Sequence, residues 1–296
     1  MTIESVGELQ DALRRRSYIA DRGLAMAIYL SLKLKRPLFL EGEAGVGKTE
    51  VAKVIAEIRN TELIRLQCYE GLDIHHAVYE WNYTRQMLHI RLMEAQGDHQ
   101  TESELFGPEY LLRRPLLRAI EATDGNPPVL LIDEIDRSDE EFEAYLLEIL
   151  SDFQITIPEI GTIKASQPPI VVLTSNRTRE VHDALKRRCL YYWIDYPSFE
   201  KELEIVRAKV PEASNMLASQ VTSFIQELRQ ADLYKLPGIA ETLEWTAALV
   251  ALDQEVLEPS IVDDTLGVIL KYQDDIAEIK GNGSRNLLKV IQSNES

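Results

Sequence analysis

The residues best suited to chemistry lie within PLFLEGEAGVGKTEVAK, residues 37–53. The run from Gly42 to Thr49 fits the spacing G-x-x-x-x-G-K-[ST], between a short apolar segment and a helix-forming one. Glycines in such a turn let backbone N–H groups approach phosphate oxygens, and the following helix points its positive end at the same anion. We expect Lys48 to reach the β- and γ-phosphates of a nucleotide and the Thr49 hydroxyl to bind Mg²⁺. The expected nucleotide-binding residues are Gly42, Glu43, Ala44, Gly45, Val46, Gly47, Lys48, Thr49 and Glu50.

Two carboxylates follow the apolar run of residues 129–132. Four consecutive apolar residues predict a strand buried on both faces of a parallel sheet, and open α/β sheets place ligands at the carboxyl ends of their strands. We therefore expect Asp133 to bind Mg²⁺ and Glu134 to polarise the attacking water. Alternatively, the two acids cap the next helix, because Ser138 and Glu141 have the spacing of a capping box. The phosphate-binding pattern earlier in the chain favours the catalytic interpretation.

Polar residues also follow two later apolar segments. Asn176 ends the predicted strand 169–176, where its amide could orient water or touch the terminal phosphate. An asparagine at this place also suits a plain turn. Arg187 and Arg188 lie between a helix-like segment and the next strand, either as solvated residues or as an arginine finger that reaches the nucleotide of another subunit.

These residues need a framework of strands that alternate with helices. Helix-like periodicity separates most of the short apolar segments, which predicts an α/β fold with a parallel sheet over residues 1–197. Only helical patterns follow, so we expect a small all-α lid domain at residues 198–280 and a tail at residues 281–296. The predicted strands are residues 38–40, 63–68, 129–132, 169–176 and 190–194.

Two segments interrupt the alternation of strands and helices. Residues 69–112 form a long insert, and a connection of this length in a compact domain commonly has a functional role. Within it, Trp81 and Tyr83 are candidates both for gripping a partner and for anchoring the core of the insert itself. Residues 153–163, FQITIPEIGTI, alternate around a Pro-Glu-Ile-Gly turn and predict a β-hairpin.

Composition limits the classes of partner. The chain has 296 residues, with 32 Lys and Arg against 49 Asp and Glu, and a net charge of −17. This charge disfavours a nucleic-acid partner, because non-specific binding to nucleic acid depends on phosphate neutralisation. The two cysteines, Cys68 and Cys189, suggest a reducing compartment. The sequence shows neither a secretion signal nor a run of about 18 apolar residues, so we expect a cytoplasmic protein without a membrane span.

Together these motifs resemble those of the AAA+ ATPases, and within them the MoxR group. The resemblance covers about residues 15–275 and rests on residues 42–49 (Walker A), residues 130–134 (Walker B), Asn176 (sensor 1), residues 187–188 (finger region) and the helical lid. The predicted hairpin falls where this clade has its pre-sensor-1 hairpin, and the segment around residues 81–91 falls where it has its helix-2 insert. The phrases YEWNYTRQMLHIR, LKRRCLYYWIDYP and LPGIAETLEW are most similar to the CoxD branch, with the CbbQ and NorQ branch next.

The resemblance implies a P-loop NTPase fold with a three-layer core, and a ring, usually a hexamer, that hydrolyses Mg-ATP between subunits. Such rings remodel or mature other proteins, often metalloenzymes, alongside a von Willebrand factor A domain protein. In the CoxD branch the client is a molybdenum–copper hydroxylase. The catalytic residues that it implies are Glu134, Lys48, Asn176 and Arg188, with Arg187 in reserve, and the metal ligands are Thr49 and Asp133.

Other functions stay open, and one residue departs from the pattern. The alternatives are a nucleotide-gated adaptor, an activase ring of the CbbQ or NorQ type, and a nucleic-acid motor. The departure is Glu241, an acid at the position that best matches the sensor-2 arginine of MoxR-type lids. We therefore assign no sensor 2.

Overall fold

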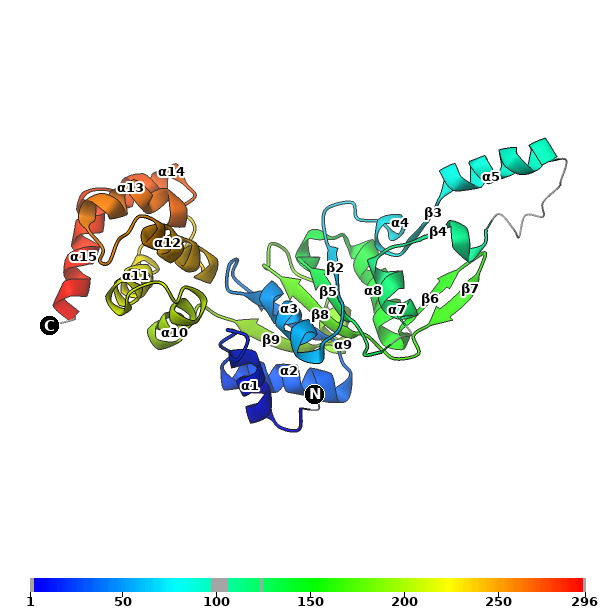
Figure 1. Cartoon of the computed structure of the whole chain (residues 1–296), viewed down its shortest axis with the longest axis horizontal. Helices are drawn as coiled ribbons and strands as arrows, with labels where there is room; N and C mark the ends of the chain where they lie inside the picture. The colour runs from blue at the N-terminus through cyan, green and yellow to red at the C-terminus, as the bar shows by residue number, and fades with distance from the viewer. Residues whose placement is uncertain (1–2, 97–105, 123–124, 295–296) are drawn as a thin grey trace. The chain divides into compact units, whose positions relative to one another are not determined.

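A five-stranded sheet forms the centre of the α/β part of the chain (Figure 1). The structure is a computed structural model that describes residues 3–96, 106–122 and 125–294. The strands lie in the order β2-β5-β8-β1-β9, and the pairs β2–β5, β5–β8 and β8–β1 are parallel. The expected α/β fold with a parallel sheet is confirmed. The strands are β1 Leu38–Gly42, β2 Leu63–Gln67, β5 Val129–Asp133, β8 Ile170–Ser175 and β9 Leu190–Ile194.

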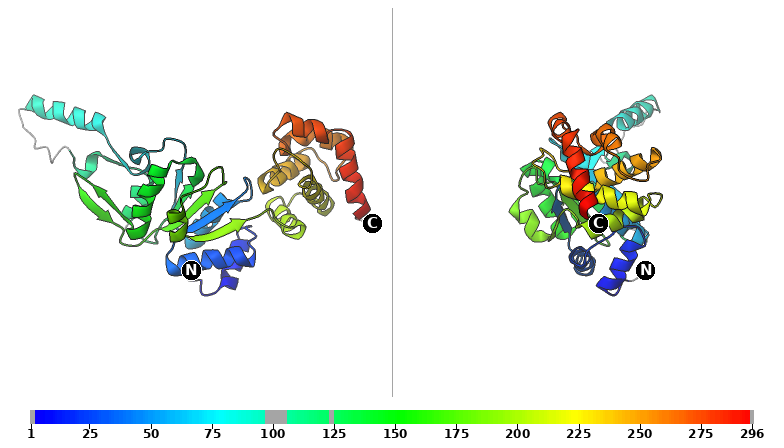
Figure 2. Two further views of the ribbon diagram at one scale, coloured as in Figure 1. Left: turned by 180° about the vertical axis from the view of Figure 1, so that it is seen from behind. Right: turned by 90° about the vertical axis from the view of Figure 1, so that its left-hand side faces the viewer.

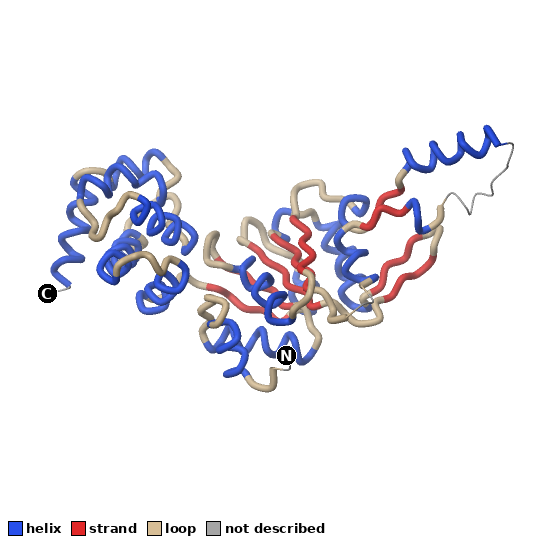
Figure 3. Tube along the Cα trace, in the orientation of Figure 1, coloured by secondary structure: helices blue, strands red, loops and turns tan. Residues whose placement is uncertain are grey.

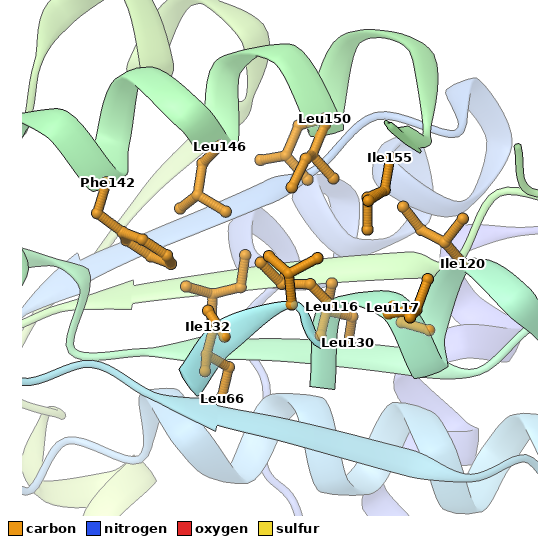
Figure 4. Close-up of a cluster of buried hydrophobic side chains, with 14 of the residues drawn as sticks. Leu66, Leu116, Leu117, Ile120, Leu130, Ile132, Phe142, Leu146, Leu150 and Ile155 are labelled. Carbon is orange, nitrogen blue, oxygen red and sulfur yellow. The ribbon is translucent and has the colours of Figure 1, made fainter. Parts of the chain in front are cut away.

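Apolar packing fixes the interior strand β5. All five of its residues are buried, as a strand inside a parallel sheet requires. Phe142, Leu146 and Leu150 of helix α8 (Glu140–Asp152) point toward Leu130 and Ile132 of β5 (Figure 4). Each such side chain contributes roughly 1.5–3 kcal/mol when fully buried. The carboxyl end of β5, where Asp133 lies, is therefore held by a rigid core.

Helices alternate with the strands, as the sequence periodicity predicts (Figure 3). Helix α8 begins after Asp139, whose side chain accepts a hydrogen bond from the backbone N–H of Phe142 at 2.8 Å. The helix therefore does not use the capping box suggested for Ser138 and Glu141, and neither Asp133 nor Glu134 caps it. The other helices of this part are α1 Val6–Arg14, α2 Arg22–Leu34, α3 Lys48–Arg59, α7 Pro115–Glu121 and α9 Asp183–Arg188, with 3-10 turns η1 Pro108–Tyr110 and η2 Ile135–Arg137.

The insert of residues 69–112 has a small sheet of its own, although its residues 97–105 lie outside the described part. Trp81 is 5% exposed and packs edge-on against Phe106, with ring centroids 5.2 Å apart, whereas Tyr83 is 61% exposed. Trp81 thus anchors the insert and Tyr83 faces solvent. The insert contains α4 Ile74–Ala77, β3 Tyr79–Trp81, α5 Tyr83–Gln96 and β4 Leu111–Arg113, and β3 and β4 are antiparallel.

A second antiparallel pair follows helix α8. Strands β6 (Gln154–Ile157) and β7 (Gly161–Lys164) lie where the alternating residues 153–163 predict a hairpin. Gly161 has a φ angle of 100°, so the turn uses a backbone conformation that favours glycine. The hairpin of the sequence analysis is therefore present.

The C-terminal part is built from helices (Figure 2). Phe224 and Trp245, with ring centroids 5.2 Å apart, lie at its apolar core. The tail expected at residues 281–296 was wrong for most of its length, because residues 282–294 form helix α15. Leu288 and Ile291, three residues apart, are buried in the same core and explain why this segment is helical. The helices are α10 Phe199–Lys209, α11 Asn215–Leu228, α12 Ile239–Ala251, α13 Pro259–Ile269, α14 Gln273–Ile279 and α15 Asn282–Asn294.

By its internal contacts the chain divides into two units. One unit comprises Met1–Leu9, Arg22–Glu41 and Thr49–Trp193. The other comprises Gln10–Asp21, Gly42–Lys48 and Ile194–Ser296, so it includes the glycine-rich loop. None of the helices in the described ranges is long and apolar enough to cross a membrane.

Candidate functional site

The glycine-rich loop between β1 and α3 has the backbone shape that its sequence predicts. Gly45 and Gly47 have φ angles of 79° and 91°, in the left-handed region that favours glycine. At Gly42 a Cβ atom would lie 2.2 Å from a backbone oxygen of β9, so another residue would clash there. The Lys48 ammonium donates to the carbonyl oxygens of Gly42 at 2.8 Å and Glu43 at 2.5 Å. The lysine is therefore held against the loop that the motif assigns to phosphate.

The remaining motif residues differ in exposure. Val46 is buried, Ala44 is half-buried and the Glu43 side chain is exposed. Glu50, in the first turn of α3, forms an ion pair with Lys53 at 3.2 Å. None of these four side chains supplies a cation for a phosphate, so they contribute backbone and shape rather than charge.

The loop also contacts the first turn of helix α12. The backbone N–H of Ala240 donates to the carbonyl oxygen of Gly45 at 3.2 Å. Glu241 accepts a hydrogen bond from the backbone N–H of Gly238 at 2.9 Å, and a Cβ atom on Gly45 would lie 2.9 Å from the same carboxylate oxygen. The acid that stands where an arginine was expected therefore caps α12 beside the loop.

In the unit built on the sheet, Thr49 and Asp133 are directly joined. The Thr49 hydroxyl donates to Asp133 Oδ1 at 3.0 Å, and the Thr174 hydroxyl donates to the same oxygen at 2.6 Å. Arg65, on the neighbouring strand β2, donates to Asp133 Oδ2 from Nη2 at 2.5 Å and from Nε at 3.0 Å. Asp133 is 2% exposed, so these bonds satisfy a buried carboxylate. Thr49 and Asp133, 84 positions apart in the chain, thus bring together a hydroxyl and a carboxylate oxygen of the kind that binds metal ions. We call these oxygens the oxygen cluster.

Glu134 lies beside this cluster in a left-handed conformation. Its φ and ψ angles are 55° and 50°, which a non-glycine residue adopts only where its surroundings hold it. Gln67 donates to its Oε2 at 3.0 Å, and Asn176 donates to its Oε1 at 3.4 Å. Its side chain stays 31% exposed and also pairs with Arg137 at 3.3 Å. The carboxylate is positioned from several sides and remains accessible to water.

Asp136 is a functional candidate that the sequence analysis missed. It is 2% exposed, and it accepts hydrogen bonds from the backbone N–H groups of Asn176 at 3.2 Å and Thr178 at 2.9 Å. The Thr178 hydroxyl also donates to it at 2.7 Å. This carboxylate therefore fixes the loop that carries Asn176. Its place three residues after Asp133 was the available signal.

Arg187 and Arg188 form their hydrogen bonds and ion pairs with residues outside this oxygen cluster. Arg187 is 81% exposed on its side chain and pairs with Asp183 at 2.6 Å. Arg188 donates to the Ser151 hydroxyl at 2.8 Å and to the carbonyl oxygen of Ala184 at 3.3 Å. Within one chain, then, neither guanidinium joins the hydrogen-bond network of Asp133 and Glu134.

Arg65 and Gln67 are the other residues that the sequence analysis missed. They lie two positions apart on β2, and so project to the same face of that strand. Leu66 and Gln67 pair in register with Ile132 and Asp133 of β5. The period of two was visible in the sequence, but the adjacency of β2 and β5 was not.

The oxygen cluster suits Mg²⁺. Mg²⁺ takes hard oxygen ligands, generally one or two protein groups completed by water and substrate phosphates. The Thr49 hydroxyl and the Asp133 carboxylate are such ligands. Within the described ranges, no group of three or more His, Cys, Asp and Glu side chains could hold a metal ion by itself. The Thr49 hydroxyl and the Asp133 carboxylate therefore fit a Mg²⁺ site in which water and phosphate oxygens would supply the other ligands.

The carboxylates also affect a buried thiol. Burial raises the pKa of the Cys68 thiol from 9.0 to about 12, and the negative charge of Asp133 adds to the shift. Burial likewise raises the pKa of Cys189 to about 12. Both cysteines are free and buried. They stay protonated at neutral pH and act as small apolar residues rather than as nucleophiles.

A strand, a glycine-rich loop and a helix, followed by an acidic pair at the end of a central parallel strand, define a P-loop α/β protein. Residues 37–189, more than half of the chain, match the model of the AAA domain family, dynein-related subfamily. The chain therefore belongs to the AAA domain family.

Similar proteins are known among bacteria. An uncharacterized protein of Staphylococcus aureus strain bovine RF122 / ET3-1 is 24% identical over 203 residues, which cover 66% of this chain and 69% of the relative. A second one, from strain USA300, is 23% identical over 203 residues with the same coverage.

Solved structures that align with the chain include a Holliday junction branch migration motor. RuvB of Thermotoga maritima aligns at 16% identity and a TM-score of 0.47, covering 90% of this chain and 72% of that one. A mutant of the same protein aligns at 18% identity and a TM-score of 0.49, with the same coverage.

Proposed function

We propose that the protein hydrolyses Mg-ATP and uses the cycle, as a MoxR-type AAA+ chaperone, to remodel or mature a partner protein. The observation that carries the ATPase proposal is the hydrogen bond between Thr49 and Asp133, with Glu134 held next to it. Phosphoryl transfer depends mainly on positioning and electrostatic stabilisation, which fixed oxygens and dipoles supply.

Each residue then has a distinct task. Lys48 and the loop N–H groups bind the phosphates, while Thr49 and Asp133 hold Mg²⁺, which when bound neutralises charge on the phosphate oxygens. Glu134 accepts a proton from the attacking water, and Asn176 orients that water or the terminal phosphate. Because Lys48 and Thr49 are consecutive, the start of helix α3 binds phosphate and metal together.

A lysine pair on helix α3 tests the ATPase proposal. We expect Lys48→Ala to lose ATP binding and phosphate release, because the buried ammonium of the loop is removed. Lys53→Ala, on the same helix, removes a half-exposed lysine and should keep both activities. Phosphate release and nucleotide binding are measured on both variants. Unchanged turnover in Lys48→Ala would remove the basis for the proposal.

We propose further that the active form is a ring, most simply a hexamer, with Arg188 acting on the nucleotide of the adjacent subunit and Arg187 in reserve. Both arginines are exposed, and neither joins the carboxylate network of its own chain. An arginine finger supplied in trans raises turnover by roughly 10³–10⁵. If mixing Arg188→Ala with Lys48→Ala subunits restores activity that each variant lacks alone, the site is shared. Mixed rings that stay inactive would exclude sharing through Arg188.

The client proposed from the resemblance is a metalloenzyme, in the CoxD branch a molybdenum–copper hydroxylase, with a von Willebrand factor A domain protein as a second partner. Helix α5 of the insert supports a role in protein binding, because four large apolar side chains on it are exposed. A surface of this kind on a helix commonly binds protein. Co-purification with ATP bound, in the Glu134→Gln variant, tests whether partners remain attached. The four exposed side chains are Tyr83 at 61%, Met87 at 53%, Leu88 at 60% and Leu92 at 53%.

A second candidate function is a nucleotide-gated adaptor, in which ATP binding alone activates the client. The exposed apolar side chains of helix α5 favour it as much as they favour a remodelling ring. Client activation by Glu134→Gln with ATP would support the adaptor, whereas loss of activation would support hydrolysis-driven work.

An activase ring of the CbbQ or NorQ type shares the same chemistry and differs only in its client. The net charge of −17 counts against a nucleic-acid motor, and salt-dependent stimulation by DNA or RNA checks that alternative.

A further inference from the structure

A basic pocket lies at the amino ends of the sheet strands, whereas Asp133 and Asn176 lie at their carboxyl ends. Its wall includes Arg36, just before β1, as well as Pro127 before β5 and Pro169 before β8. It therefore opens at the amino ends of three parallel strands. Ligands of open α/β sheets normally bind at the carboxyl ends, so this pocket is separate from the candidate nucleotide site.

Three cations line this pocket in a chain whose net charge is −17. They are Lys35, Arg36 and Arg59, which come from the loop after α2 and from the last residue of α3. Like charges that share a small volume repel one another, and an acidic chain offers many carboxylates that could relieve the repulsion. Across the described ranges, however, no ion pair joins Lys35 or Arg59 to an acidic side chain.

The Arg59 side chain is the clearest sign of a missing partner. Its Nε is buried and has no hydrogen-bond partner among the described residues. A buried donor without a partner costs roughly 1–3 kcal/mol, and more when the group is charged. Asn126 donates from Nδ2 to the carbonyl oxygen of Arg59 at 3.0 Å, which fixes the end of helix α3 at the pocket. The Arg59 guanidinium therefore carries donor capacity that the described part of the chain does not use.

Arg36 already uses its Nε and Nη2 donors within the protein, so it contributes mainly charge to the pocket. Its guanidinium donates to the carbonyl oxygens of Arg187 at 2.9 Å, Arg188 at 3.3 Å and Cys189 at 3.4 Å. The donors available to a ligand are therefore mainly those of Lys35 and Arg59, together with the polar side chain of Gln167. An ammonium and a guanidinium that line the same pocket are suitable donors for an oxyanion.

The size of the pocket limits the ligand. Its volume is about 240 Å³, which is below the range of roughly 300–1,000 Å³ typical of sites for larger organic ligands. Pro127, Pro168 and Pro169 contribute rigid, donor-free walls. The pocket thus suits a compact anion of more than one negative charge.

We propose that this pocket is a binding site for a small multivalent oxyanion of the phosphate type, held by Lys35 and Arg59 in the field of Arg36. The site is distinct from the candidate nucleotide site, because none of the pocket residues belongs to the glycine-rich loop or to the network of Asp133 and Glu134. The same oxyanion could be free in solution or be the phosphate group of a small organic phosphate.

Nuclear magnetic resonance of the full chain tests this site directly. Inorganic phosphate is titrated at constant ionic strength while the side-chain amide signals of Asn126 and Gln167 are followed, since both line the pocket. We expect saturable shifts with phosphate and none with chloride. Phosphate on the glycine-rich loop is separated by repeating the titration in Lys48→Ala, in which the pocket shifts should persist. The titration is repeated with glycerol phosphate. Tighter binding of glycerol phosphate than of inorganic phosphate would identify an organic phosphate as the ligand, and the reverse would identify the free oxyanion.

A charge-matched pair of double variants provides the control. Lys35→Ala with Arg59→Ala should weaken the phosphate affinity at least tenfold, whereas Arg285→Ala with Lys289→Ala, two exposed cations of helix α15, should leave it unchanged. The single variant Arg59→Gln serves as a second test if the double variant unfolds, and it too should weaken binding. Equal phosphate affinity in the pocket and control variants, or the absence of any saturable shift, would overturn the proposal.

Discussion

Asp136 fixes the backbone of Asn176: the Asn176 N–H donates to Asp136 Oδ1 at 3.2 Å, across 40 residues of sequence. Asp136 is buried and holds Thr178 by two further hydrogen bonds. The Asn176 side chain in turn reaches Glu134 Oε1 at 3.4 Å. Asp136 therefore positions Asn176, although in the proposed reaction only Asn176 contacts the water or the phosphate.

Weakening this anchor should lower catalysis more than nucleotide affinity. Asp136→Asn keeps the shape but turns one acceptor into a donor that faces backbone N–H groups. Loss of a hydrogen bond to a charged group costs about 1.5–3 kcal/mol, so we expect kcat to fall about tenfold or more while KM for ATP changes little. Asp152→Asn, at an exposed site, is the matched control. A rise in KM with unchanged kcat would show that Asp136 does not position the catalytic group.

Arg65 should compete with Mg²⁺ for Asp133. Its guanidinium donates two hydrogen bonds to Asp133 Oδ2, and its own side chain is 53% exposed. Removing that cation in Arg65→Ala leaves the carboxylate more negative toward a metal. We expect the free Mg²⁺ concentration for half-maximal ATPase activity to fall severalfold, together with some loss of stability. A higher Mg²⁺ requirement in Arg65→Ala would mean that Arg65 supports the metal site instead.

Two glycines should respond to alanine in opposite directions. A Cβ atom on Gly238 would lie 2.7 Å from the carbonyl oxygen of Ala44, whereas one on Gly267 meets nothing within 4 Å. Overpacking costs roughly 1–3 kcal/mol, so Gly238→Ala should lower the free energy of unfolding by that amount. Gly267 lies inside helix α13, where alanine is favoured by roughly 0.5–1 kcal/mol. Urea unfolding of both variants measures the difference, and equal midpoints would contradict the close contact at Gly238.

The two buried thiols should make the protein less stable at high pH. Their folded-state pKa of about 12 lies above the ordinary value of 9.0, because burial disfavours the thiolate. The folded chain therefore holds these protons more tightly than the unfolded chain. The associated stability is complete below pH 9 and is lost as the pH rises toward 12, by up to about 1.4 kcal/mol per thiol and pH unit.

A cysteine-free control isolates that contribution. Unfolding free energies between pH 8 and pH 11 are compared for the natural chain and for Cys68→Ala with Cys189→Ala. The variant should lose less stability over this range, although its buried tyrosines also titrate. Parallel pH profiles for the two proteins would show that the thiols are not responsible.

The sequence sufficed for the order along the chain of the five strands of the main sheet and for the expectation that Thr49 and Asp133 serve the same metal. Both follow from local patterns, namely apolar runs, a glycine-rich turn and the rule that polar residues gather at the carboxyl ends of parallel strands. Arg65 could not be placed in this way, because its role depends on β2 lying next to β5. Which strands are neighbours is decided by tertiary packing rather than by periodicity.

The local sequence pattern also could not predict which single residues of the insert and of helix α15 are buried. Trp81 and Tyr83 lie two positions apart, yet one is 5% and the other 61% exposed, because β3 ends between them and α5 begins. Gly281, Asn282 and Gly283 predict a tail by their composition, yet residues 282–294 form helix α15. Its later Leu288 and Ile291 pack into a core formed by distant helices.

The most direct measurement of the proposed ATPase is phosphate release by Glu134→Gln beside Glu141→Gln. Glu141 is an exposed acid of helix α8, so its variant carries the same change in charge. Glu134→Gln should bind ATP as the natural chain does and release phosphate at least a hundredfold more slowly, because the general base is lost. Glu141→Gln should match the natural chain. Equal phosphate release by the two variants would contradict the assignment of Glu134 and the hydrolytic site built around it.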